Sequence, residues 1–120
     1  MKKNAFVLAA MLAATPAFAN NFPDGNVVVF GPGKRPCAEW TKAKDNRDVV
    51  LQNYFTSWAT GFVSGIASAS KDVNASAMKM RDSYVIDHWI DTYCLQHPKD
   101  LVYQAAGEFA TKLADEGANQ

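Results

Sequence analysis

The sequence has little of what several functional classes need. It contains two cysteines and two histidines in 120 residues, and its 12 Lys and Arg are balanced by 12 Asp and Glu. Because there is no basic surplus, and no Lys/Arg cluster longer than Lys34-Arg35, we expect neither nucleic acid nor anionic lipid as a partner. A zinc site normally takes three or four ligands, and His and Cys are its commonest ligands. Because the chain has only two of each, we expect no metal and no cofactor.

Long apolar runs are equally scarce. A run of ten apolar residues lies near the start, from Ala5 to Ala14. It follows the basic pair Lys2-Lys3 and precedes Ala17-Phe18-Ala19, which is the pattern of a secretory signal peptide. A membrane span would need about 20 apolar residues. We therefore expect residues 1–19 to be cleaved, and the mature chain from Asn20 to be periplasmic or secreted from a bacterium, without membrane insertion.

Residues 20–120 carry ten Lys/Arg and twelve Asp/Glu, a net charge of −2 once Lys2 and Lys3 are gone. A chain of this size buries a modest core, so a cross-link helps it to fold. In an oxidising compartment the expected use of Cys37 and Cys94 is a disulfide bond. The chain-entropy model values such a bond at about 4 kcal/mol.

The N-terminal half predicts an extended arm over 20–36, a short helix over 37–47 and a long helix from about Asp48 to Ser68. Turn formers surround the apolar run 27–30, and no later segment resembles a partner strand. The long helix has Asp48 as its N-cap. Apolar residues at the three-and-four spacing of one helix face predict its buried side: Leu51, Tyr54, Phe55, Trp58, Phe62 and Ile66.

The C-terminal half predicts an exposed loop over 68–76 and two further helices. The third helix is expected from about Ala77 to Leu95, with a buried face of Val85, Ile86, Trp89, Ile90, Tyr93 and Cys94. Pro98 breaks it, and the fourth helix ends near Gly117. Its apolar face is Leu101, Val102, Ala105, Ala106, Phe109 and Leu113. We therefore expect an all-α domain over 37–117, a compact bundle of about four helices with one disulfide, preceded by the arm. Its aromatic core residues are Trp40, Trp58, Phe62, Trp89 and Tyr93.

Ser57, Gly61 and Gly65 form a line of small residues at four-residue steps beside the apolar face of the long helix. Glycine inside a helix costs about 1 kcal/mol relative to alanine, which suggests that another backbone approaches there. Polar Gln52 and Asn53 exclude a transmembrane pair. We expect close packing of a soluble helix pair, either within one chain or between two chains.

The one cluster that could hold a metal or relay a proton is Asp87, His88 and Asp91, and solvated helix surface is the favoured interpretation. With both cysteines oxidised, no Cys/His nucleophile is available. The serine in Gly61-Phe62-Val63-Ser64-Gly65 is in the wrong place for a nucleophile elbow. We therefore expect that the protein is not an enzyme.

The order of motifs resembles a known family. Gly-Pro-Gly-Lys precedes Cys37-Ala38-Glu39-Trp40, then come the segments 58–65 (Trp-Ala-Thr-Gly-Phe-Val-Ser-Gly) and 89–98 (Trp-Ile-Asp-Thr-Tyr-Cys-Leu-Gln-His-Pro). Over roughly residues 31–113 this is similar to the small secreted Rap/Tai-type immunity proteins of type VI secretion amidase effectors, and more distantly to the HdeA-like periplasmic helical proteins. The shared motifs are tryptophans, glycines and cysteines, which specify the fold better than the activity.

The resemblance implies a periplasmic protein-binding module, an immunity-type inhibitor that binds and occludes a secreted cell-wall amidase, often as a homodimer. The family's toxin-contacting loops vary, so no contact residue is carried over. From the sequence itself we select the 70–76 loop and the adjoining helix face as the partner-binding surface: Lys71, Asp72, Asn74, Arg81, Asp82, Asp87, His88 and Asp91. The alternatives are an acid or envelope-stress chaperone of the HdeA type, in which Met78 and Met80 add adaptable apolar surface, and an uncharacterised envelope accessory protein.

Overall fold

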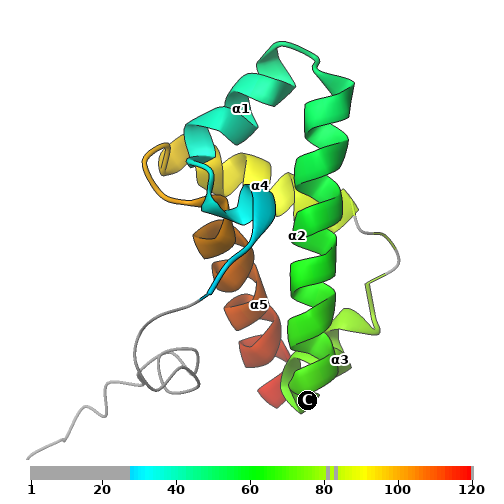
Figure 1. Cartoon of the computed structure of the whole chain (residues 1–120). Helices are drawn as coiled ribbons and strands as arrows, with labels where there is room; N and C mark the ends of the chain where they lie inside the picture. The colour runs from blue at the N-terminus through cyan, green and yellow to red at the C-terminus, as the bar shows by residue number, and fades with distance from the viewer. Residues whose placement is uncertain (1–27, 81, 83, 120) are drawn as a thin grey trace, which may run out of the picture.

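The computed structural model describes residues 28–80, 82 and 84–119, and within them the fold is all-α (Figure 1). The elements in chain order are η2 (Gly31–Lys34), α1 (Cys37–Asp45), α2 (Val49–Ala69), α3 (Lys71–Ala77), α4 (Tyr84–Gln96) and α5 (Val102–Ala118). The expected all-α bundle is confirmed, with five α-helices in the described residues in place of about four. The expected signal peptide and the first part of the arm, residues 1–27, lie outside the described residues.

The described end of the expected extended arm packs across the bundle, and part of it is a short 3-10 helix. Val29, Pro32 and Gly33 are buried, and η2 contacts both α2 and α5. A Cβ added at Gly33 would overlap the ring of Trp58. Only glycine therefore lets this turn lie directly on the tryptophan.

Helix α2 has the expected bounds, because the side chain of Asp48 caps it by accepting a hydrogen bond of 3.0 Å from the backbone N–H of Leu51. Its expected buried face is rotated by about a quarter of a turn from the observed one, and Phe55 belongs to both. Tyr54 is 53% exposed, and the fully buried residues are Phe55, Ala59, Val63 and Ala67. Leu51, Trp58, Phe62 and Ile66 are half-buried at the edge of the core. The two alanines are buried in the core, and the half-buried Trp58 and Phe62 pack against it.

The expected loop over 68–76 was wrong, because most of it is α3. The hydroxyl of Ser70 caps the helix by accepting from the N–H of Val73, and Val73 is 1% exposed. Helix α3 packs along α5, where a Cβ at Gly117 would overlap the carbonyl oxygen of Asp72. Short polar residues that favour turns locally are held helical here by the cap and by packing against α5.

The third expected helix begins later than predicted, at Tyr84 rather than near Ala77. Asp82 fixes this start because its Oδ1 accepts a 2.9 Å hydrogen bond from the N–H of Tyr84. Ile86, Ile90 and Cys94 form its buried line, while Trp89 and Tyr93 are half-buried and Val85 is exposed. The prediction that Val85 is buried was therefore wrong.

Helix α5 follows its prediction closely. The apolar face expected for it is buried, apart from half-buried Leu101 just before the helix. The side-chain Oε1 of Gln104 accepts a 2.8 Å hydrogen bond from the N–H of Leu101. The helix continues one residue past Gly117.

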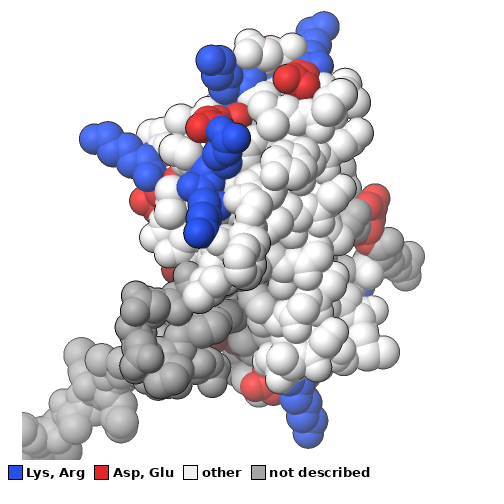
Figure 2. Space-filling model, viewed as in Figure 1, with Lys and Arg blue, Asp and Glu red and all other residues white. Residues whose placement is uncertain are grey.

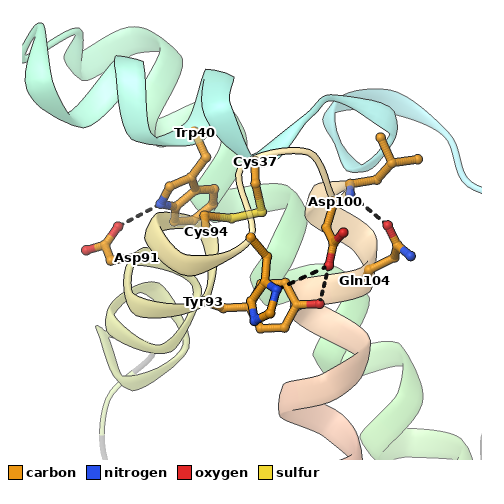
Figure 3. The surroundings of a disulfide bond; sticks show 9 residues. Cys37, Trp40, Asp91, Tyr93, Cys94, Asp100 and Gln104 are labelled. Carbon is orange, nitrogen blue, oxygen red and sulfur yellow. Dashed lines mark hydrogen bonds and ion pairs between the residues drawn. A yellow bond between two sulfur atoms is a disulfide. The ribbon is translucent and has the colours of Figure 1, made fainter.

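The predicted disulfide bond joins Cys37 and Cys94 (Figure 3), and backbone hydrogen bonds between the flanking segments support it. The N–H of Cys37 donates to the carbonyl of Asp100 at 2.7 Å, and the N–H of Ala38 donates to Pro98 at 3.0 Å. In the other direction, Val102 donates to Arg35 at 2.9 Å. Both sulfur-bearing residues are 0% exposed, and Trp40 beside them is fully buried. This joint fixes the start of α1 to the end of α4 and the start of α5.

Candidate protein-binding surface

The structure separates the residues predicted to bind a partner. Lys71, Asp72 and Asn74 lie on α3 with their side chains exposed, and Asp82 and His88 are exposed before and on α4. Arg81 lies outside the described residues. Asp87 is buried and Asp91 is half-buried, so the predicted surface is not continuous.

Asp87 was predicted to be solvated, and this prediction was wrong. It lies inside the bundle, with polar partners on two other helices. Its carboxylate pairs with Lys44 of α1, and its Oδ1 accepts a 2.6 Å hydrogen bond from Thr56 Oγ1 of α2. Burying a carboxylate is costly unless it is paired and hydrogen-bonded, and here it is both. Asp87 therefore ties α4 to α1 and α2, and is not available to a partner.

Asp91 completes the same network one helical turn further along α4. Its Oδ1 accepts a 2.6 Å hydrogen bond from the indole N–H of Trp40 (Figure 3). It also lies 3.6 Å from Lys44 Nζ, and this ammonium sits 5.3 Å from the centre of a Trp40 ring. The predicted metal-or-relay cluster is thus split: two carboxylates hold the fold, and His88 between them faces solvent.

A second polar cluster lies beside the disulfide bond. The hydroxyl of Tyr93 donates to Asp100 Oδ2 at 2.7 Å, and the ring of His97 lies 4.5 Å from the ring of Tyr93. Burial, then the hydrogen bond and negative charge of Asp100 and the charge of Glu108, raise the pKa of Tyr93 to about 12. At neutral pH this tyrosine is a hydrogen-bond donor that fastens α4 to the start of α5, and it is unsuited to act as a nucleophile.

The exposed residues around the α3–α4 connection form the best candidate for partner contact. We call this the 78–88 surface: Met78, Asp82, Tyr84, Val85 and His88. Met78 is 79% exposed and Tyr84 is 68% exposed. An exposed methionine and tyrosine next to charged groups is a composition typical of protein interfaces.

A hollow of about 240 Å³ lies at the base of the 78–88 surface. It lies between α2 and the α3–α4 connection, and its lining includes Thr60, Ser64, Met80, Asp82 and Ile86. Two hydroxyls and a carboxylate at its rim could hydrogen-bond a side chain inserted from a partner. The hollow could not be predicted from the sequence, because it depends on where α4 begins.

Other kinds of site find no support in the described part of the chain. No group of three or more His, Cys, Asp or Glu residues there could hold a metal ion. Among the described helices none is long and apolar enough to cross a membrane. Both cysteines are in the disulfide bond.

No protein-family model, curated protein or solved structure matches this chain. Its function is therefore inferred from its own residues.

Proposed function

We propose that the mature protein is a periplasmic protein-binding module, an immunity-type inhibitor that binds a secreted cell-wall amidase and occludes its active site. The observation that supports it best is the 78–88 surface, in which Met78 is 79% and Tyr84 is 68% exposed and Asp82 and His88 are also exposed. Large exposed side chains with charged neighbours are suited to insertion into the cleft of another protein.

The scaffold behind this surface supports an inhibitory role. The interactions of Asp87 with Lys44 and Thr56 fix α4 against α1 and α2. The disulfide bond fixes the C-terminal end of α4. A surface held on a rigid element loses little conformational entropy on binding, so more of its contact energy appears as affinity. An inhibitor that must block an enzyme before it damages the cell wall needs such affinity.

The first experiment uses the mature chain, residues 20–120, at neutral pH. It is incubated with candidate amidase effectors, and bound protein is recovered and identified by mass spectrometry. Release of peptidoglycan fragments by the recovered amidase is then measured with and without the mature chain. A stoichiometric complex with loss of amidase activity is the expected result, and an amidase that keeps full activity in the complex would contradict it.

A matched pair of variants locates the contact. Tyr84 and Leu95 lie at opposite ends of α4, and each is 68% exposed. We expect Tyr84→Glu to weaken inhibition at least tenfold, a loss of about 1.4 kcal/mol or more, and Leu95→Glu to leave it unchanged. Equal effects of the two substitutions would remove the 78–88 surface from the inhibitor contact.

An acid-stress chaperone is the second candidate, and the Lys44–Asp87–Asp91 network favours it. The negative charges that hold α4 to Lys44 of α1 are carboxylates, and loss of charge on paired carboxylates is the general cause of acid denaturation. Release of α4 would expose apolar surface near Met80 and Ile86 that could bind unfolded clients. The test is suppression of client aggregation at pH 2 to 3. A chain that stays folded and inactive there would exclude this role.

A further inference from the structure

The proposed mature chain keeps all of its accessible sulfur in one place. The sequence has four methionines, and two of them, Met1 and Met11, fall in the expected signal peptide. The other two, Met78 and Met80, lie in the connection between α3 and α4. Both cysteines are joined in the disulfide bond and are 0% exposed. An oxidant in solution therefore finds thioether sulfur only at the 78–88 surface and in the hollow at its base.

The two methionines differ in how well solvent reaches them. Met78 is 79% exposed. Met80 is half-buried, packs against the core and lines the hollow together with Ile86. The susceptibility of a side chain to oxidation follows its exposure. We therefore expect Met78 to be oxidised before Met80.

Hydrogen peroxide is a sufficient oxidant for this step. A lone pair of the Met78 sulfur attacks one peroxide oxygen, so that an S–O bond forms as the O–O bond breaks. The sulfur is oxidised by loss of an electron pair, and the departing hydroxide takes the proton of the transferred oxygen and leaves as water. The product is methionine sulfoxide, which is polar and chiral, and methionine sulfoxide reductases return it to methionine.

Helix α2 forms a neutral wall beside this site. It contains no charged residue over its 21 positions, and Figure 2 shows an uncharged surface over α2 with charged groups gathered near its two ends. The close packing expected at Ser57, Gly61 and Gly65 does not occur within the described chain. These residues are exposed, and a Cβ at either glycine would come within 4 Å of no described atom beyond its own helix. On this side of the hollow, a partner meets apolar atoms and hydroxyls and no charge.

An oxygen on Met78 therefore acts on binding and not on folding. In the free chain the exposed sulfoxide stays hydrated, so the fold is unaffected. A partner that covers Met78 must strip water from the sulfoxide oxygen, and burial of a polar group without a hydrogen bond is costly. Oxidation also removes the flexible apolar contact that methionine supplies at protein interfaces.

We propose that Met78 is a reversible oxidation site, at which formation of the sulfoxide releases the partner from the 78–88 surface and enzymatic reduction restores binding. The regulatory role rests on the proposed function, because that function assigns the surface to the inhibitor contact. The selectivity of the oxidation is a property of the chain alone and is measured without a partner.

The first experiment follows the mature chain in hydrogen peroxide at neutral pH by peptide mass spectrometry. The expected result is that Met78 gains one oxygen atom before Met80 does, and that the circular dichroism spectrum of the Met78-oxidised chain is unchanged. Methionine sulfoxide reductases of both stereospecificities, supplied with a reductant, should remove the oxygen. Oxidation of Met80 before Met78, or loss of helical signal when only Met78 is oxidised, would overturn the inference.

The second experiment measures inhibition of the amidase. The oxidised chain is freed of peroxide before mixing, so that the effector never meets the oxidant. We expect inhibition to weaken at least about tenfold and to return after treatment with the reductases. Each variant is compared with itself before and after peroxide: Met78→Leu should keep whatever inhibition it has, whereas Met80→Leu, the matched control, should lose inhibition as the wild type does.

The outcomes separate this inference from the proposed function. Inhibition that survives full oxidation of Met78 would overturn the inference and leave the proposed function standing. Loss of inhibition by peroxide-treated Met78→Leu would assign the effect to another residue and also overturn it. A chain that fails to inhibit any amidase before oxidation would overturn the proposed function, and the regulatory role with it.

Discussion

Asp87 is the residue whose environment differs most from what its type suggests. It is 7% exposed, and its carboxylate pairs with Lys44 and accepts a hydrogen bond from Thr56. We expect Asp87→Ala to lower the free energy of unfolding by about 2–3 kcal/mol, because the half-buried Thr56 hydroxyl loses its acceptor and Lys44 keeps only the more distant Asp91. Urea denaturation at neutral pH measures this. The neighbouring His88→Ala should change stability by less than about 0.5 kcal/mol, and equal losses would contradict the assignment of Asp87 to the interior.

Tyr93 predicts an alkaline loss of stability. Its pKa is about 12 in the folded chain and about 10 when unfolded. The folded state therefore holds the phenol proton more tightly, so the stability that Tyr93 adds is fully present below pH 10 and is lost as pH rises toward 12. Absorbance titration of tyrosinate should show one of the four tyrosines ionising last. Tyr93→Phe should remove that step and flatten stability between pH 10 and 12, and a step that persists in this variant would contradict the prediction.

At the scale of elements, the sequence predicted best where a helix has a local start signal and a continuous apolar stripe. Asp48 fixed the start of α2, and the stripe through Phe109 predicted the buried side of α5. It predicted poorly where tertiary packing decides. Helix α3 was missed because Asn74 and Ser76 favour turns locally, and its helical state depends on Val73 packing against α5.

The candidate surface was predictable only in part. Asp82 and His88 were selected from the sequence and are exposed, and Met78 was noted there only as apolar surface for the chaperone alternative. Tyr84 stands out only once α4 is seen to begin at this residue. Asp87 was misplaced because helical periodicity gives the direction of a side chain and not the number of helices around it.

The α3–α5 contact gives a prediction about glycine. A Cβ at Gly117 would overlap the Asp72 carbonyl, so Gly117→Ala must separate α3 from α5 or fray the end of α5. We expect it to lower the free energy of unfolding by about 1–2 kcal/mol. Gly107→Ala, in open space on the same helix, should raise it by about 0.5–1 kcal/mol. Thermal unfolding distinguishes the two, and two shifts of the same sign would contradict the close approach.

At the scale of the whole molecule, the disulfide bond is the largest single constraint. Cys37 and Cys94 are 57 residues apart in the chain, so removing the bond frees a long loop in the unfolded state. We expect the Cys37→Ala, Cys94→Ala double variant to lose about 2–4 kcal/mol of stability. Urea denaturation of this variant, and of wild type with a reductant, should give the same fall. A loss below about 1 kcal/mol would show that packing alone closes the fold.

The joint between residues 35–38 and 98–102 also sets when this protein can fold. Helix α1 has its backbone partners at Pro98 and Asp100, and the pairing is completed by Val102. Until Pro98 and Asp100 have emerged from the ribosome, α1 lacks the segment on which it docks. The first α-helix of the fold thus waits for the start of the last one, and the chain reaches its native state only after nearly all of it has emerged.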